Sequence, residues 1–456
     1  MATTTESQRD PVRGPRRSYG RAIPLALLAG LAGLGVGRFV SYDGGGGSPP
    51  PVAVAASSPK ARLAGLERAA ALRPDDPRAW QELGSTYVRL AIATGDPTYF
   101  SGAERALARA RELDPTSPVT LVAEGTFALT LHQFAEALRL GEEAEEIDPF
   151  NPEAKAVRVD ALIELGRYDD AADTLQDLLD LRPGLAALTR VSYLRQLSGD
   201  LDGALAAMQQ ARAAGSQGFE SAVATALQGE IHLLQGDLDL ARRAFDASLR
   251  QSPGLVGGEL GRARVLEATG QRAEAIQTLD AAVEAIGSPA LAVLLGELLE
   301  AEGDVSGAET AYETARQVYR DEVAAGAIVD LELAFLEADH GSPTTALQSA
   351  RLAYAARPNI YTSDAMAWAL YRSGRATEAV PFAEESLRRG TTDPALRTHA
   401  AAVFVASGRT DDARAALAGP AAIGGYMPPS LRATASDLGR TLGIEVPDHW
   451  RSDPVP

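Results

Sequence analysis

Five histidines and a few adjacent acids are the residues of this 456-residue chain whose types could support acid–base or metal chemistry. Two histidines four residues apart on a helix, or Cys and His at short spacing, would predict a metal site. The histidines show neither arrangement, and there is no cysteine to supply a thiolate or a disulfide. The spacing therefore predicts no metal site. The histidines are His132, His232, His340, His399 and His449.

Two acid pairs, Glu142-Glu143 and Asp169-Asp170, are candidates for paired-carboxylate catalysis. They fall where solvated helix faces or helix starts are expected, and nothing in the pattern would separate the pKa values of the two carboxyl groups. The glycine-rich residues 254–261 lack the Lys-Ser/Thr ending of a phosphate-binding loop. We therefore expect that the protein is not an enzyme and uses no cofactor.

The elements that must position any functional side chain follow a period of 34 residues. Pro115, Pro149 and Pro183 stand at this interval, and each falls where a helix would end. Small residues repeat at the same interval and would let two helices cross closely. These residues are Ala103, Ala137 and Ala171. A period of this length predicts an array of helix-turn-helix repeats.

The first full repeat carries a recognisable motif. Its first helix contains Trp80, Leu83, Gly84 and Tyr87, which is the spacing W-x2-L-G-x2-Y. With Ala103 and Pro115 in the second half, the chain resembles a tetratricopeptide repeat (TPR) protein of the bacterial membrane-anchored or exported type. The resemblance implies an all-α fold, a right-handed superhelical solenoid of about ten helix-turn-helix repeats. Residues 365–379, together with His399, resemble the end of many bacterial exported members of the family.

The later repeats keep the period although the motif fades. We expect about ten units, a long inter-helix loop near residues 91–96, and slack joints near 213–221 and 319–327. The turn glycines that mark the units are Gly166, Gly199, Gly236, Gly270, Gly303, Gly374 and Gly408. The corresponding second-helix alanines are Ala204, Ala241, Ala275, Ala308, Ala346, Ala379 and Ala413.

The N-terminal residues differ in composition from the repeats. We expect a cytoplasmic basic tail at residues 1–21, a transmembrane signal-anchor helix at 22–40 and a Gly/Pro-rich linker at 41–57. The rival interpretation is a signal peptide cleaved near residues 53–55, which would release a secreted protein. The superhelix should span 58–419. A C-terminal capping helix and tail should fill 420–456, the helix starting at Ser430 as its N-cap.

The charge is unevenly distributed along the chain. Residues 1–50 hold six arginines and three acids, whereas the remainder holds 37 basic and 58 acidic residues. Nucleic acid binding depends on neutralising phosphates with Lys and Arg. An acidic body therefore excludes nucleic acid as an expected partner.

The resemblance also implies where a partner would bind, because in this family the first helix of each pair lines the concave face. A central acidic run and a C-terminal aromatic cluster then occupy the contact positions. The acidic run comprises Glu153, Asp160, Glu164, Glu230, Glu267, Glu297 and Glu300, with Tyr193 and Arg264 among them. The aromatic cluster comprises Phe335, Asp339, Tyr361, Asp364, Trp368, Tyr371 and Arg372. Eleven of these form the expected partner-binding set: all seven of the cluster with Tyr193, Glu230, Arg264 and Glu297.

The expected function is that of a membrane-tethered protein–protein interaction scaffold. Its concave surface would bind an extended segment of a partner protein outside the cytoplasmic membrane. A clamp of Lys and Asn for a C-terminal carboxylate, known in the family, is not present, because Gln81, Ser85, Val122 and Thr126 stand at those positions. The alternative is a secreted or periplasmic binding protein for a small solute or a cell-wall glycan after signal cleavage.

Overall fold

The computed structural model describes residues 59–94, 97–213 and 218–451. The described residues form 22 α-helices and two short 3₁₀-helices, with no strand among them, which confirms the all-helical expectation. The expected membrane segment at 22–40, the basic tail and the linker lie outside the described residues. Within the described ranges, no helix combines the length and the apolar character that crossing a membrane requires.

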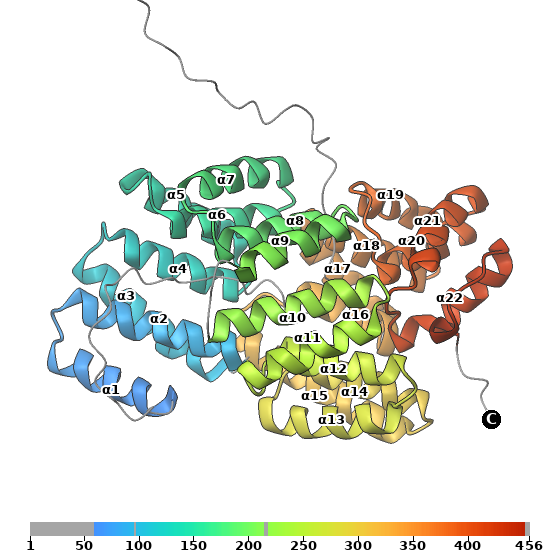
Figure 1. Ribbon diagram of the computed structural model, residues 1–456, viewed down its shortest axis with the longest axis horizontal. Helices are drawn as coiled ribbons and strands as arrows, with labels where there is room; N and C mark the ends of the chain where they lie inside the picture. The colour runs from blue at the N-terminus through green and yellow to red at the C-terminus, as the bar shows by residue number, and fades with distance from the viewer. Residues whose placement is uncertain (1–58, 95–96, 214–217, 452–456) are drawn as a thin grey trace, which may run out of the picture.

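Ten helix pairs lie between a first single helix, α1 (Pro59–Leu72), and a last one, α22 (Pro429–Leu442) (Figure 1). The first helices of the pairs are α2 (Pro77–Thr94), α4 (Pro118–Thr130), α6 (Pro152–Glu164), α8 (Leu185–Gln196), α10 (Phe219–Leu234), α12 (Val256–Ala268), α14 (Pro289–Ala301), α16 (Asp330–His340), α18 (Ile360–Arg372) and α20 (Pro394–Ala406).

Each first helix packs antiparallel against a second helix from the same repeat. The second helices are α3 (Phe100–Leu113), α5 (Phe134–Ile147), α7 (Tyr168–Leu181), α9 (Leu201–Ala213), α11 (Leu238–Gln251), α13 (Arg272–Ile286), α15 (Val305–Ala324), α17 (Pro343–Ala356), α19 (Ala376–Leu387) and α21 (Thr410–Ile423). The 3₁₀-helices are η1 (Pro97–Tyr99) and η2 (Asp448–Trp450).

The residues of the 34-residue period act as expected. Helices α3, α5 and α7 each end two residues before Pro115, Pro149 and Pro183. The next first helix begins at a proline in α4 and α6, with a side-chain N-cap ahead of it, as where Asn151 accepts from the Ala154 amide at 2.9 Å. The alanines Ala103, Ala137 and Ala171 are fully buried where the helices of a pair cross.

Four expectations about the joints and the C-terminus are wrong in detail. Residues 91–94 extend α2 instead of forming a long loop, and α15 runs through 319–324, where a slack joint was expected. Helix α21 continues past 419 to Ile423 with Pro420 inside it. Helix α22 starts at Pro429 without a side-chain cap, because the Ser430 hydroxyl donates to Glu297 Oε1 at 2.8 Å instead.

The repeats wind so tightly that one turn of the superhelix meets the next. We call this contact the seam: the turns inside the early repeats lie against the linkers that join later repeats, about 190 residues further along. Ile328 donates its amide to Leu131 O at 3.0 Å, and Tyr426 donates its amide to Leu233 O at 3.1 Å. Between these two points, Asn359 Nδ2 donates to Glu164 O at 2.7 Å.

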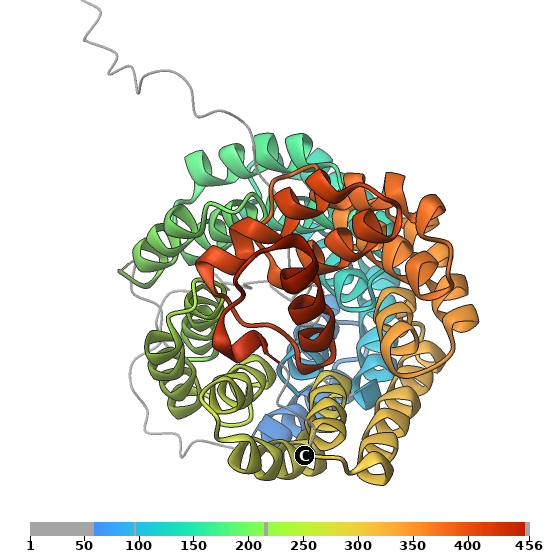
Figure 2. The same ribbon diagram turned by 90° about the vertical axis from the view of Figure 1, so that its right-hand side faces the viewer.

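A buried ion pair strengthens the middle of the seam. Arg357 Nη1 lies 2.7 Å from Glu164 Oε2, and the guanidinium also stacks over the Phe134 ring, 4.7 Å from its centroid. The Ile360 amide donates to the Tyr168 hydroxyl at 3.2 Å. Seen along its axis, the chain forms a ring of helices around a lumen, with the C-terminal helix across the end that faces the viewer (Figures 1 and 2). The seam therefore turns an open spiral into a closed wall.

Candidate functional site

A cavity of about 340 Å³ lies in the lumen between the turns; we call it the chamber. Its walls come from first helices, α10 through α20, with additions from the end of α15 and from residues 426–431 before and in α22. This arrangement agrees with the expectation that first helices line the concave face. Seven of the eleven expected contact residues line it: Glu230, Arg264, Glu297, Phe335, Asp339, Tyr361 and Asp364.

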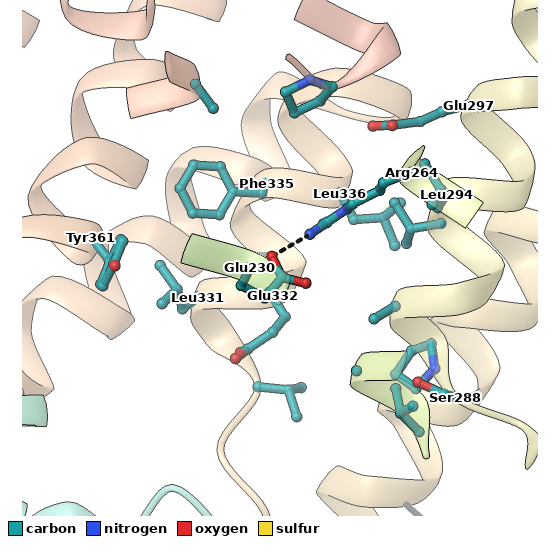
Figure 3. A pocket seen from close by; sticks show the side chains of 18 of the residues that line it. Glu230, Arg264, Ser288, Leu294, Glu297, Leu331, Glu332, Phe335, Leu336 and Tyr361 are labelled. Atoms are coloured by element: carbon teal, nitrogen blue, oxygen red, sulfur yellow. Dashed lines mark ion pairs between the residues drawn. The ribbon is translucent and has the colours of Figure 1, made fainter. Parts of the chain in front are cut away.

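The chamber brings together two zones that are far apart in the sequence. Glu230 and Arg264 belong to the central acidic run, and Phe335 and Tyr361 to the aromatic cluster, yet all four face one space (Figure 3). The superhelix produces this meeting, because the repeats of one turn surround a common axis and their first helices face one another across it. The two predicted zones are therefore opposite walls of one site.

Aliphatic side chains make up most of the chamber wall. Valine and leucine from four first helices contribute the largest share, and the volume falls in the range of small-ligand pockets. The aliphatic lining residues of α10, α12, α14 and α16 include Val223, Leu227, Val256, Val293, Leu294, Leu331 and Leu336. Such a wall favours a ligand, or part of one, with an apolar body.

Seven carboxylates line the chamber alongside one arginine and three histidines, so its charge is negative. They are Glu230, Glu297, Glu322, Glu332, Asp339, Asp364 and Asp393. Several of these carboxylates already form hydrogen bonds or ion pairs with other residues of the protein. Asp393 caps α20 by accepting from the Ala395 amide at 2.8 Å, and Asp364 Oδ2 lies 3.0 Å from His399 Nδ1.

Glu230 and Glu332 each keep one oxygen without a hydrogen-bond partner. The Arg264 guanidinium approaches Glu230 Oε2 only to 3.7 Å, and Glu230 Oε1 is buried and unpartnered. Glu332 Oε1 lies 3.8 Å from His132 Nδ1, while its Oε2 is buried and unpartnered. Burial raises the pKa of Glu230 to about 7, although the charge of Arg264 opposes the shift. Buried acceptors without donors are costly, and such groups mark candidate sites.

Five further chamber side chains carry buried polar atoms without a partner: Arg264 Nε, His340 Nε2, His399 Nε2 and the hydroxyls of Tyr361 and Tyr426. The Tyr426 hydroxyl has no partner although the residue is only 7% exposed, and His399 Nε2 has none although that residue is 4% exposed. Burial opposes protonation of His399, but the carboxylates of Asp364, Asp339 and Asp393 outweigh it and raise the pKa of the imidazole. The chamber thus holds hydrogen-bonding capacity that the fold leaves unused.

Three members of the expected cluster pack behind the chamber wall. Trp368 is only 1% exposed, and its indole N–H donates to Asp339 Oδ1 at 2.8 Å. Its ring stacks on those of Tyr371 and His399, with centroids 5.0 and 4.1 Å away, and Arg372 lies over it. These contacts make Trp368 part of the packing that holds Asp339 and His399 in place.

The rest of the acidic run is paired with arginines, except Glu300, which accepts from the Tyr312 hydroxyl at 2.8 Å. Arg190 Nε donates to Asp160 Oδ1 at 2.7 Å, and Glu164 pairs with Arg357 across the seam. Glu267 and Arg432 of α22 form a two-pronged pair, with Arg432 Nη1 to Glu267 Oε1 at 2.5 Å. These acids bind the turns and the C-terminal helix together. Tyr193, the remaining expected contact residue, is partly buried and packs against the core beside the seam.

Sequence reasoning missed Glu332 and His399 as lining residues. Leu227, Leu294 and Glu332 each stand three residues before a predicted contact: Glu230, Glu297 and Phe335. One helical turn separates residues three or four apart, so both positions face the lumen. A search at this second position of each first helix would have found Glu332, and His399 at the same place in α20.

Metal chemistry has no support from the clustering of side chains. In the described ranges, no three His, Asp or Glu side chains come close enough together to hold a metal ion.

Comparison with known proteins supports the repeat architecture. Residues 128–191 match one family model for the tetratricopeptide repeat, and residues 193–256 and 260–324 match another. No relative was found among curated protein sequences.

Several solved structures are similar to this chain at low identity. The human IFIT1 dimer with m7Gppp-AAAA is 14% identical with a TM-score of 0.47, covering 72% of this chain and 77% of that one. Yeast Tom70 is 15% identical with a TM-score of 0.38, covering 87% and 94%. A tetratricopeptide repeat protein from Parabacteroides merdae is 18% identical with a TM-score of 0.37, covering 54% and 98%.

Three matched windows in succession, ten helix pairs and the buried alanines at the repeat period agree with one another. Repeats of this kind build protein–protein interaction scaffolds, because their stacked helices create extended concave surfaces. The chain is a tetratricopeptide repeat protein.

Proposed function

We propose that this protein is a membrane-tethered interaction scaffold without catalytic activity, and that its lumen binds an extended segment of a partner protein outside the cytoplasmic membrane. The chamber is the observation that supports this proposal best. It gathers apolar walls and unpartnered polar atoms on the face that the family uses for partner segments. The tether is inferred from the apolar residues 22–40 and the basic residues before them.

Site-specific photo-crosslinking tests the lumen as the binding surface. A benzophenone amino acid replaces Phe335, which lines the chamber, in the full chain produced in its own cells. The control replaces Phe150, which is 77% exposed on a linker outside the chamber. We expect peptides of one partner protein to crosslink at position 335 and not at 150. Equal crosslinking at both positions, or none at 335, contradicts the proposal.

The tether is tested separately by sequencing the N-terminus of the mature protein. An intact N-terminus in the membrane fraction supports the signal anchor. A mature chain that starts near Ala56 overturns it and favours the second candidate, a secreted or periplasmic binder of a small solute. The size of the chamber, about 340 Å³, is the observation that favours this second candidate, because it suits a small ligand.

A further inference from the structure

We propose that the chamber binds an organic cation on an apolar stem, a guanidinium or ammonium group whose charge is received by Glu230 and Glu332. This inference rests on the proposed function in one respect: the expected source of the cation is an Arg or Lys side chain of the partner segment. A free alkylamine or alkylguanidine has the same chemistry and is the other source.

The first argument is the balance of charge. Seven carboxylates line the chamber against one arginine and three histidines, and that arginine approaches Glu230 only to 3.7 Å. Glu230 and Glu332 both point into the open space, and each has an oxygen with no donor (Figure 3). A buried charge without a partner is expensive, and a cation between these two groups would supply the missing one.

The second argument is independent of the acids. The Tyr426 hydroxyl lines the same chamber, is buried and has no partner. A hydroxyl and two carboxylate oxygens are acceptors, and a guanidinium carries five N–H donors in a plane with no acceptor. A ligand rich in donors therefore matches these three unpartnered acceptors.

The third argument concerns the remainder of the ligand. Leu331, Leu294 and Val256 line the same chamber as these polar atoms, and Phe335 presents its ring to this space (Figure 3). A hydrated inorganic ion would gain nothing from this surface, whereas an alkyl stem would be removed from water. The pattern is that of a site for Arg or Lys, whose long stems bury while the charged head finds acceptors.

Hexylguanidinium is the probe that tests the inference on the full chain by titration calorimetry. We expect saturable binding with one site. Guanidinium without a stem and hexan-1-ol without a charge should each bind at least about tenfold more weakly, because each lacks one half of the match. Hexanoate should not bind. If hexan-1-ol binds as well as hexylguanidinium, the charge plays no part and the inference is wrong.

Variants identify the groups involved. Glu230→Gln should weaken hexylguanidinium binding at pH 8 by about tenfold or more, and Tyr426→Phe by a few-fold. Glu230→Gln removes a buried charge that burial disfavours, and Tyr426→Phe removes a buried hydroxyl without a partner, so neither should lower the melting temperature. Glu142→Gln is the matched control, because this exposed glutamate changes the net charge equally. Unchanged binding in Glu230→Gln overturns the assignment.

The two sources and the two proposals can be told apart. Crosslinked peptides at position 335 that contain Arg or Lys identify the side chain, whereas an amine released from the purified protein and no peptide identifies a free solute. If peptides crosslink but hexylguanidinium does not bind, the cation site is wrong and the scaffold stands. If the probe binds and no peptide crosslinks, the scaffold is wrong and the cation site stands.

Discussion

Glu230 shows how a single side chain can indicate a binding site because it lowers the stability of the folded state. Its carboxyl group is buried, and the Arg264 guanidinium comes no closer than 3.7 Å. Burial raises the pKa of this carboxyl group to about 7. An unfolded chain would hold this carboxyl near its usual pKa of 4.5. A residue that destabilises the folded state is retained where it serves binding, because another residue type at the same position would usually give a more stable protein.

The stability cost of Glu230 has a definite dependence on pH. Below pH 4.5 the carboxyl is protonated in both states and contributes nothing. Between pH 4.5 and 7 only the unfolded state releases the proton, so stability falls as pH rises. We expect Glu230→Gln to be more stable than the wild type by up to about 3 kcal/mol at pH 8 and equal to it at pH 4. Urea unfolding at both pH values measures the difference, and a Gln variant less stable at pH 8 contradicts it.

Trp368, unlike Glu230, has its polar atom and its ring in contact with other residues of the protein. Its type and position made it an attractive anchor for a partner, since aromatics are common in interfaces. In the structure its N–H donates to Asp339, and its ring stacks on the rings of Tyr371 and His399. Position on a first helix does not distinguish a residue that faces the lumen from one that packs between repeats, so sequence reasoning could not separate Trp368 from Phe335.

At the scale of elements, the turn glycines divide into two groups that the sequence presents as one. All seven predicted turn glycines have positive φ angles. A Cβ on Gly166 would lie 2.5 Å from Pro358 O across the seam, and one on Gly236 would lie 2.7 Å from Gly424 O. A Cβ on Gly270 or Gly303 would meet nothing within 4 Å. The seam glycines therefore have two roles. They allow the left-handed backbone between the two helices of a repeat, and they leave room for the linker of the next superhelical turn.

This division predicts different costs for the same substitution. Gly270→Ala should destabilise the protein by about 1 kcal/mol, the usual cost of a left-handed backbone for alanine. Gly166→Ala should cost at least about 2 kcal/mol more, because the seam must also move away from the methyl group. Denaturant unfolding of the two variants gives the comparison, and equal losses would mean that the seam does not constrain the turn.

The helix pairs were predictable and the seam was not, for a physical reason. Prolines, glycines and alanines act on neighbouring helices, so their spacing specifies each repeat directly, as at Ala137 and Pro149. The seam depends on how many small inter-repeat rotations make one turn, which no single residue encodes. Arg357 and Glu164 therefore gave no signal of their pairing. For the same reason the chamber could be predicted as two separate zones but not as one.

At the scale of the whole molecule, the seam joins parts of the chain that a simple solenoid keeps apart. In a repeat protein without such contacts, each repeat is stabilised only by its own packing and by the two repeats next to it. Here Glu164 and Arg357, 193 residues apart, hold two turns together, and Glu267 with Arg432 fixes the C-terminal helix across one end of the ring. The lumen consequently has a fixed width, and the chamber exists only while the turns remain stacked.

Breaking the seam pair should open the superhelix. Arg357→Ala leaves Glu164 buried without its cation, which should cost about 3–5 kcal/mol and enlarge the radius of gyration. Arg182→Ala is the control: it removes an arginine from the more exposed pair with Glu153, 2.6 Å away, and should cost at most about 1 kcal/mol. Unfolding curves and small-angle scattering report both effects. An unchanged radius with a small loss in Arg357→Ala would show that other seam contacts suffice.

The closed seam also decides by which route a ligand can arrive. If the edge of the superhelix were free, an internal segment of a folded partner protein could enter the lumen from the side. A wall joined at Leu131–Ile328 and Leu233–Tyr426 admits a chain without breaking contacts only along the axis, by threading a free end. Selection then depends on the topology of the partner as well as on its side chains: a terminal tail can enter, whereas the same residues within a closed loop of a folded domain stay outside.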